Sequence, residues 1–234
     1  MFVILASCHD ESARELARRW GSRNAAVLTG QDLSRSGWRY WPDRLADSTA
    51  IIGGEKIRAQ EIQGVLTRLA YVPEHELRQI AREDRAYVAA EMTAFLRSWL
   101  ASLRCPVLNP PTSTCLSGPG WHQEQAVHTA AGLGIPVRPV EWRVELSVDI
   151  PRDEPAPPGV TVTVVGDGCV GSPDCTLATL ARRLAGSARV DLLAVRFEET
   201  EAGIRLCGAD PWPDVSSPEV ADAIIGYFCS GREC

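Results

Sequence analysis

The sequence predicts an α/β protein in which an open, mostly parallel N-terminal sheet is joined to a smaller C-terminal α+β region. Short apolar runs alternate with an amphipathic helix near the start of the chain. A long apolar helical stripe occupies the middle, and two strands joined by a turn precede a final helix. The composition, with 45% hydrophobic and 23% charged residues, is ordinary for a globular protein that buries a core.

The first part of the chain carries the parallel-sheet pattern. Three short runs have the apolar character of buried strands, at 2–5, 25–30 and 48–54. Residues 10–20 between the first two runs place apolar side chains at helical spacing, with Ser12 and Glu15 spaced as a capping box. Strand, helix and further strands in this order predict an open layer with crossover connections. The chain has no GxGxxG motif, so it does not predict a standard dinucleotide-binding fold.

The middle of the chain predicts a long helix, a short strand and a second helix. An apolar stripe typical of core packing lies between Pro73 and Leu103, formed by Val88, Met92, Phe95, Leu96, Trp99 and Leu103. "CPVLNPPTS" then predicts a strand that runs into an Asn-Pro-Pro turn, and a helix is expected near 121–132. His122 and His128 do not share a helical face well, so they do not indicate a metal site.

The strongest linker signal is "RDEPAPPG" at 152–159, which is rich in proline and charge. Residues 142–150 alternate like a strand with one exposed face, and residues 160–168 are rich in valine and threonine. A β-hairpin or a sheet edge is expected around the linker.

The C-terminal part predicts a helix, a two-stranded hairpin and a last helix. Residues 176–186 form an amphipathic pattern, and "RVDLLAVRFEETEAGIRLCGAD" indicates two strands joined at the Glu-Ala-Gly turn. The last helix is expected to begin at Ser217 as N-cap, with Pro218 in its first turn.

Charge and cysteine content limit the possible functions. The formal charge of −6 gives no electrostatic reason to expect a nucleic-acid partner. Lys56 is the only lysine among 24 basic residues, a bias that bacterial high-GC codon usage also produces. The eight cysteines form no CxxC motif and predict reduced, mostly buried thiols.

Nothing in the sequence indicates a membrane segment. No stretch approaches the ~20 apolar residues of a membrane span. The lipobox-like residues Leu5 to Cys8 lack a preceding basic region, and the apolar run before them is short. We therefore expect a cytoplasmic protein.

Two stretches of the chain carry a family resemblance. The first is "YVAAEMTAFLRSWLASLRCPVLNPP" followed by "QEQAVHTAAGLGIPVRP", and the second is "VVGDGCVGSPDCTLATLARRLA" with "VDLLAVRFEETEAGIRLCGADPWPDVSSPEVADAIIGYF". Together they resemble the ATP-grasp superfamily, in the branch that modifies ribosomally made precursor peptides and includes the ribosomal-protein glutamate ligases. The resemblance implies a pre-ATP-grasp-like α/β domain at 1–140 and a truncated ATP-grasp-like C-terminal α+β lobe at 160–234. Residues 141–159 would form a linker or hairpin in place of the central nucleotide-binding lobe.

The resemblance also locates a metal and nucleotide site whose residues depart from the family pattern. The glutamate that holds magnesium in the family falls on Gly208, and the following asparagine or acid falls on Asp210. Asp167 would stand for an upstream acid. Where the family has a lysine before a helix, this chain has Trp121 and His122.

Other residues offer only partial replacements for the family's ligands. Cys207 is a poor magnesium ligand because thiolate is soft. Arg143 or Arg152 could contact phosphate, since arginine recognises oxyanions. No metal ligands are assigned, and the candidate binding residues are Asn109, Trp121, His122, Arg143, Asp167 and Asp210.

The first functional hypothesis is a catalytically inactive ATP-grasp-like protein without ATP or magnesium. It would act as a partner subunit or as a peptide-recruiting module in a biosynthetic, peptide-modifying pathway. Its partner would be a full-length ligase, another tailoring enzyme or a precursor peptide, and a homodimer is equally compatible.

Three alternatives remain open. The chain could be a minimal ATP-dependent carboxylate–amine ligase that a partner subunit completes. It could instead be a cysteine-dependent enzyme that uses Cys8, next to His9 at the end of the first strand, where parallel sheets face ligand crevices. Adjacent strand residues point to opposite faces, so His9 is poorly placed to activate Cys8. A cysteine-based metal or redox sensor is the third alternative.

Overall fold

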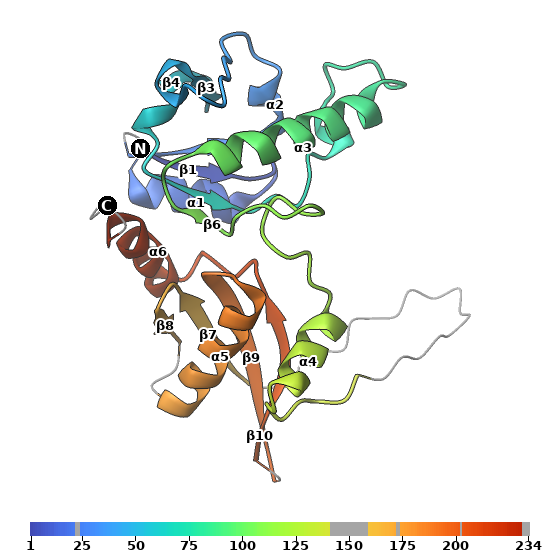
Figure 1. Cartoon of the computed structure of the whole chain (residues 1–234), viewed down its shortest axis with the longest axis vertical. Coiled ribbons are helices and arrows are strands. Elements are labelled where there is room, and N and C mark those ends of the chain that lie inside the picture. The colour runs from blue at the N-terminus through green and yellow to red at the C-terminus, as the bar shows by residue number, and fades with distance from the viewer. Residues whose placement is uncertain (22–23, 141–158, 172–173, 202, 231–234) are drawn as a thin grey trace.

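The described part of the chain forms two four-stranded sheets and a separate two-stranded hairpin. A computed structural model describes residues 1–21, 24–140, 159–171, 174–201 and 203–230. One sheet lies in the upper half of Figure 1 and the other in the lower half, with the last helix beside both. The predicted α/β class, with a parallel N-terminal sheet and a C-terminal α+β region, is confirmed.

The N-terminal sheet is parallel throughout. Its strands lie in the order β2-β1-β5-β6, with bounds Phe2–Leu5 (β1), Ala25–Leu28 (β2), Gly64–Thr67 (β5) and Val107–Leu108 (β6). Phe2 and Ile4 pack with helix α1 (Glu11–Trp20). Val3 and Leu5 pack with helix α3 (Arg85–Ser102) on the other face, because successive strand side chains alternate.

Two expectations for this region are wrong. Residues 48–54 do not join the parallel layer, because β3 (Thr49–Ile52) pairs antiparallel with β4 (Glu55–Arg58) in a sheet of their own. Gly53 and Gly54 make the turn between them with positive φ angles of 58° and 85°, and a hairpin closed by so short a turn leaves no crossover.

The capping box predicted from Ser12 and Glu15 is also wrong. The N-cap of α1 is Asp10, whose carboxylate accepts the Ala13 N–H at 2.9 Å. The short helices of this region are α2 (Gly30–Leu33) and the 3₁₀ turns Leu45–Asp47, Ala59–Glu61 and Glu74–Glu76.

The C-terminal sheet is antiparallel, in the order β10-β9-β7-β8. Its strands are Val160–Val165 (β7), Gly168–Val170 (β8), Leu192–Thr200 (β9) and Gly203–Asp210 (β10). Helices α4 (Gln123–Gly132) and α5 (Cys175–Ala188) pack on one face. The hairpin predicted across the Glu-Ala-Gly turn is confirmed. The strand expected at 142–150 lies outside the described residues.

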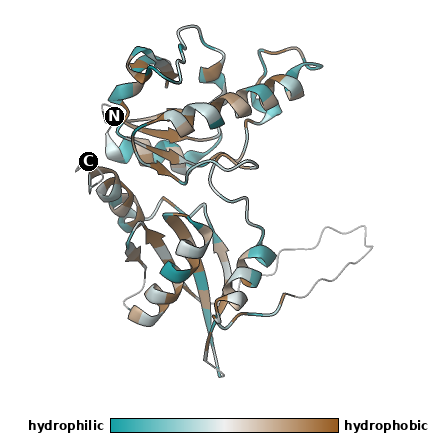
Figure 2. Cartoon of the chain, viewed as in Figure 1, coloured by the Kyte–Doolittle hydropathy of each residue, from teal (hydrophilic) through white to brown (hydrophobic). Residues whose placement is uncertain are grey.

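Helix α6 (Pro218–Ser230) joins the two sheets through one apolar cluster. Its Phe228 stacks on Phe2 at 5.5 Å between ring centroids, and the same cluster contains Val165 and Leu192 of the second sheet. A Cβ on Gly64 would lie 2.5 Å from the Phe228 ring, so the sheet needs glycine there. In Figure 2, α6 lies beside brown, apolar strands of the two sheets. Among the described helices, none combines the length and apolar character needed to cross a membrane.

Candidate functional site

The buried side chain of Asn109 connects the end of the parallel sheet to the second sheet. Its Nδ2 donates to the carbonyl oxygens of Leu192 at 2.8 Å and Pro211 at 3.5 Å. Its Oδ1 accepts the N–H groups of Asp191 at 3.2 Å and Leu192 at 2.9 Å. We call these four contacts the Asn109 junction. Both ends of the amide are used, so this predicted binding residue holds the fold together.

A second set of contacts supports the junction. Arg68 follows β5, and its Nε donates to the Asp10 carboxylate at 2.8 Å. Its Nη1 donates to the carbonyl of Pro213 at 3.0 Å. Both side chains are mostly buried, at 15% and 17% exposed, so the carboxyl ends of β1 and β5 are closed by the segment after β10.

The strands of the second sheet also border an open hollow on the side of Trp121. Its volume is about 470 Å³, and we call it the Arg196 hollow. Eight residues line it: Trp121, Gln123, Thr161, Ala194, Arg196, Gly208, Ala209 and Asp210. Gln123 is fixed at its edge because its Nε2 donates to the carbonyl of Cys207 at 3.1 Å.

A β-bulge determines which side chains meet at this hollow. The register of β10 against β9 shifts between Leu206 and Gly208, so Gly208 lies directly opposite Arg196. Thr161 is the partner of Arg196 on the other side, and Asp210 lies opposite Ala194. The position that corresponds to the family's magnesium-binding glutamate, Gly208, therefore lies next to a guanidinium.

Positive charge predominates beside the bulge. Glu198 is only 8% exposed and has two guanidinium neighbours, Arg205 Nη2 at 3.2 Å and Arg138 Nη1 at 3.9 Å. Arg196 adds a third guanidinium near Cys207, and burial beside Glu198 raises the pKa of the Cys207 thiol. The buried Nε atoms of Arg196 and Arg205 have no hydrogen-bond partner among the described residues.

The donors present do not fit a magnesium ion. Gly208 offers no side chain, the Cys207 thiol is soft, and Glu198 is already paired with arginines. One carboxylate, Asp210, remains, and it accepts the N–H of Trp212 at 2.7 Å. Within the described part of the chain, no three histidine, cysteine or acidic side chains gather closely enough to hold a metal. We therefore derive no catalytic step through a metal–nucleotide complex.

The other predicted binding residues lie apart from one another. Trp121 lines the Arg196 hollow. His122 is instead the exposed N-cap of α4, and its backbone N–H donates to Gln125 Oε1 at 3.0 Å. Asp167 lies in the β7–β8 turn, beside a different hollow that Tyr227 lines. Arg143 lies outside the described residues.

Cys8 lies beside a buried carboxylate. Its backbone N–H donates to Glu76 at 3.2 Å, and Ser7 donates to the other oxygen of the same carboxylate. Burial and the charge of Glu76 raise the pKa of the Cys8 thiol. A nucleophilic cysteine needs the opposite shift. The His9 ring stacks on His75, with centroids 6.4 Å apart.

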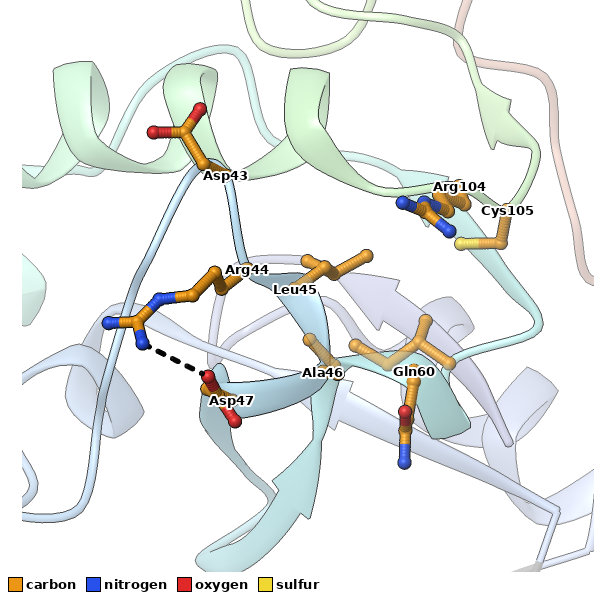
Figure 3. A pocket seen from close by; sticks show the side chains of 10 residues that line it. Asp43, Arg44, Leu45, Ala46, Asp47, Gln60, Arg104 and Cys105 are labelled. Atoms are coloured by element: carbon orange, nitrogen blue, oxygen red, sulfur yellow. Dashed lines mark ion pairs between the residues drawn. The ribbon is translucent and has the colours of Figure 1, made fainter.

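A further hollow of about 470 Å³ lies in the first half of the chain, between the 3₁₀ turns and the end of α3. In Figure 3 one ion pair is marked among the side chains that line it, between Arg44 and Asp47 at 3.6 Å. Burial raises the pKa of Cys105, on the opposite side, to about 11. The Cys105 thiol is therefore neutral at physiological pH.

Sequence reasoning missed Arg196, and the only arginines that it considered were Arg143 and Arg152, near the predicted linker. The hairpin turn before Gly203 gives an approximate register, but the extra residue at Cys207 decides that Gly208 faces Arg196. A bulge of this kind has no reliable signal in one sequence.

No family model matches this chain, and no curated protein matches it. Solved structures do match. The macrocyclase MdnC from Microcystis aeruginosa MRC, bound with precursor peptide MdnA, aligns with a TM-score of 0.66 and 12% identity. The alignment covers 98% of this chain and 100% of that one.

Two ATP-grasp ligases align similarly. PsnB, complexed with a phosphomimetic variant of its minimal precursor, Mg and ADP, gives a TM-score of 0.66 at 13% identity, over 97% of this chain and 98% of that one. A RiPP-associated ATP-grasp ligase from Chryseobacterium gregarium, in complex with ADP and a leader and core peptide, aligns with a TM-score of 0.61 and 10% identity. That alignment covers 98% of this chain and 96% of the ligase chain. The chain therefore shares the fold of these ATP-grasp ligase structures, as the sequence resemblance implied.

Proposed function

We propose that this chain, whose fold is that of ATP-grasp ligases, is catalytically inactive and recruits a peptide or a partner enzyme in a peptide-modifying pathway. The observation that supports this proposal is the pairing of Gly208 with Arg196 at the position that corresponds to the family's magnesium-binding glutamate. A guanidinium repels a divalent cation, and one exposed carboxylate does not offset it.

The lysine content supports the same proposal. Phosphoryl chemistry is mainly electrostatic stabilisation of phosphate oxygens by metal ions and positive side chains. Lys56, the only lysine, is exposed on β4 of the separate hairpin, in the other half of the molecule from the Arg196 hollow.

Domain bounds of 1–140 and 160–234, with 141–159 in place of a central lobe, remain part of the proposal.

Peptide recruitment is supported by the solved structures of similar fold, which include complexes with precursor peptides. At 10–13% identity these structures show a shared fold only. A peptide partner for this chain is therefore our inference.

Thermal unfolding with and without Mg²⁺-ATP tests inactivity. We expect no rise in melting temperature at 5 mM nucleotide, because a ligand stabilises only the state that binds it. A rise that EDTA abolishes would contradict the proposal and would favour the ligase alternative.

Affinity capture from the native host tests recruitment. We expect the tagged chain to retain a peptide-modifying ligase or a ribosomally made precursor peptide, identified by mass spectrometry and re-tested with purified components. Failure of every such component to bind the purified chain would contradict a recruiting role.

A further inference from the structure

We propose that the outward side of helix α3 is a dimer interface, on which α3 of a second copy of this chain packs antiparallel about a two-fold axis at Ala94. Three features of this side support a second copy as its occupant, independently of the proposed function. They are its low charge, the open apolar surface beside it and the order of its residues.

The first feature is the low charge of the outward side. The inward side of α3 packs in the core through residues such as Leu96 and Trp99. Among residues 86–102, however, only Glu91 and Arg97 are charged. A surface helix usually carries charged residues opposite its apolar stripe, whereas a helix with little charge on any side is normally covered. The outward side of α3 therefore has the composition of a contact surface.

The second feature is apolar surface left open on and beside the helix. Tyr87 of α3 is 69% exposed, and Tyr71, in the segment before the helix, is 64% exposed. Tyr71 also lines a hollow of about 450 Å³, whose lining on α3 includes Ala86, Ala90 and Ala94. Small side chains let two helix axes approach closely, and exposed aromatic rings supply apolar area to bury on contact. This surface therefore suits a second helix.

The third feature is the order of residues along the outward side, which identifies the second helix as another α3. Seven residues three or four apart lie on this side, and all are exposed except the half-buried Arg97. They are Tyr87, Ala90, Glu91, Ala94, Arg97, Ser98 and Ala101. In an antiparallel pair centred on Ala94, each residue faces the position of the second copy that lies equally far on the other side of Ala94.

This register matches side chains by size. Tyr87 faces Ala101 of the second copy, so a large side chain packs on a small one. The two copies of Ala94 meet at the axis, where small residues permit close contact. A two-fold axis repeats every contact, because residue i faces residue j and residue j faces residue i.

The register also matches charge. Glu91 and Arg97 are separated by about 9 Å along their own helix, and neither forms an ion pair with a residue in the described part of the chain. Arg97 Nε is buried without a hydrogen-bond partner there. In the antiparallel pair Glu91 faces Arg97 of the second copy, and the axis produces this ion pair twice. Both charges therefore find opposite partners in a second copy of the same helix.

The test is the mass of the full chain in solution, measured by sedimentation equilibrium at micromolar concentration. We expect twice the 25.4 kDa of one chain. Arg97→Glu and Glu91→Arg should each raise the dimer Kd about tenfold or more, because each places like charges opposite one another at two symmetric positions. A mixture of the two variants should dimerise again, since the carboxylates of one variant then face the guanidinium groups of the other.

Further variants control for general effects of charge and folding. Arg14→Glu on α1, which packs on the opposite face of the parallel sheet from α3, is the matched control and should leave the dimer unchanged. Ala94→Glu is a second disrupting variant at an exposed position, because its two carboxylates would meet at the axis. Melting temperatures equal to that of the wild type exclude misfolding.

Three results would overturn the inference. A monomeric wild-type chain at micromolar concentration would leave this side of α3 to a different partner. A dimer that survives both charge reversals would place the interface elsewhere, and a mixture that stays monomeric would reject the antiparallel register. No sample contains nucleotide or peptide, so these failures are distinct from the results that would contradict the proposed function.

Discussion

The Asn109 junction and the Arg196 hollow both depend on polar side chains at the second sheet, but their hydrogen-bonding states differ. Asn109 is 1% exposed, and both ends of its amide have backbone partners. Arg196 is half-buried, and its Nε has none among the described residues. A satisfied buried amide stabilises a fold, whereas an unsatisfied guanidinium beside open space is available to a ligand. The contrast separates residues kept for structure from residues available for binding.

The largest expected effect on the free energy of unfolding concerns Phe228 of α6, which packs in the apolar cluster shared by the two sheets. Phe228→Ala should lower the free energy of unfolding by about 4 kcal/mol, because it leaves a cavity between Phe2 and Trp20. Urea denaturation followed by circular dichroism measures it. Tyr227→Phe, which loses only the hydrogen bond to Asp191, should cost about 1 kcal/mol. Equal losses in the two variants would contradict a core shared by the two sheets.

The next effect concerns the junction itself. Asn109→Ala should lower the free energy of unfolding by about 3 kcal/mol, because buried backbone groups of Asp191 and Leu192 lose their partners. The exposed Asn24, whose Nδ2 donates one hydrogen bond to the Trp20 carbonyl at 3.3 Å, is the control, and Asn24→Ala should cost under about 1 kcal/mol. A loss at Asn109 no larger than at Asn24 would show that the junction contributes little.

A smaller effect is expected at Cys8. Burial and Glu76 raise its thiol pKa, so the thiol is neutral at pH 7.5 and should react with iodoacetamide more slowly than the exposed Cys175 and Cys229. The rate should increase as the pH rises through the raised pKa. Glu76→Gln should accelerate the reaction at pH 7.5, as measured by mass spectrometry of tryptic peptides. A Cys8 that reacts fastest at neutral pH would favour the cysteine-enzyme alternative.

The smallest effect on stability is expected at the hollow. Arg196→Gln should change the free energy of unfolding by less than about 0.5 kcal/mol, because no hydrogen bond or ion pair to a described residue is lost. The same urea experiment measures it beside Asn109→Ala. A loss of about 2 kcal/mol or more would show that Arg196 has a structural partner and would remove the contrast between the two regions.

Sequence reasoning succeeded where patterns were local. The apolar spacing of α1, α5 and α6 and the hairpin at the Glu-Ala-Gly turn identified these elements with their packing faces. It failed where pairing was non-local. β5 (Gly64–Thr67) was missed although it is as long as β1 and β2, and the run at 48–54 was given its place in the sheet.

The candidate site shows the same limit. The positions of Gly208 and Asp210 were found from the family pattern, and Trp121 reaches the same hollow. Asn109 was expected to bind a ligand, but its contacts are within the fold because the second sheet, distant in sequence, lies against it. Arg196 was missed because its place opposite Gly208 depends on the bulge at Cys207.

Calorimetric titration with Mg²⁺-ATP tests the central claim, loss of the metal–nucleotide site, most directly. Wild-type protein should release no binding heat. The Gly208→Glu/Arg196→Asp double variant, which places two carboxylates near Asp210 where a Cβ has room at Gly208, should gain magnesium binding. Gly208→Glu alone should not, because the new carboxylate would pair with Arg196. Wild-type binding with a magnesium-dependent Kd below about 1 mM, equivalent to about 4 kcal/mol, would contradict the account.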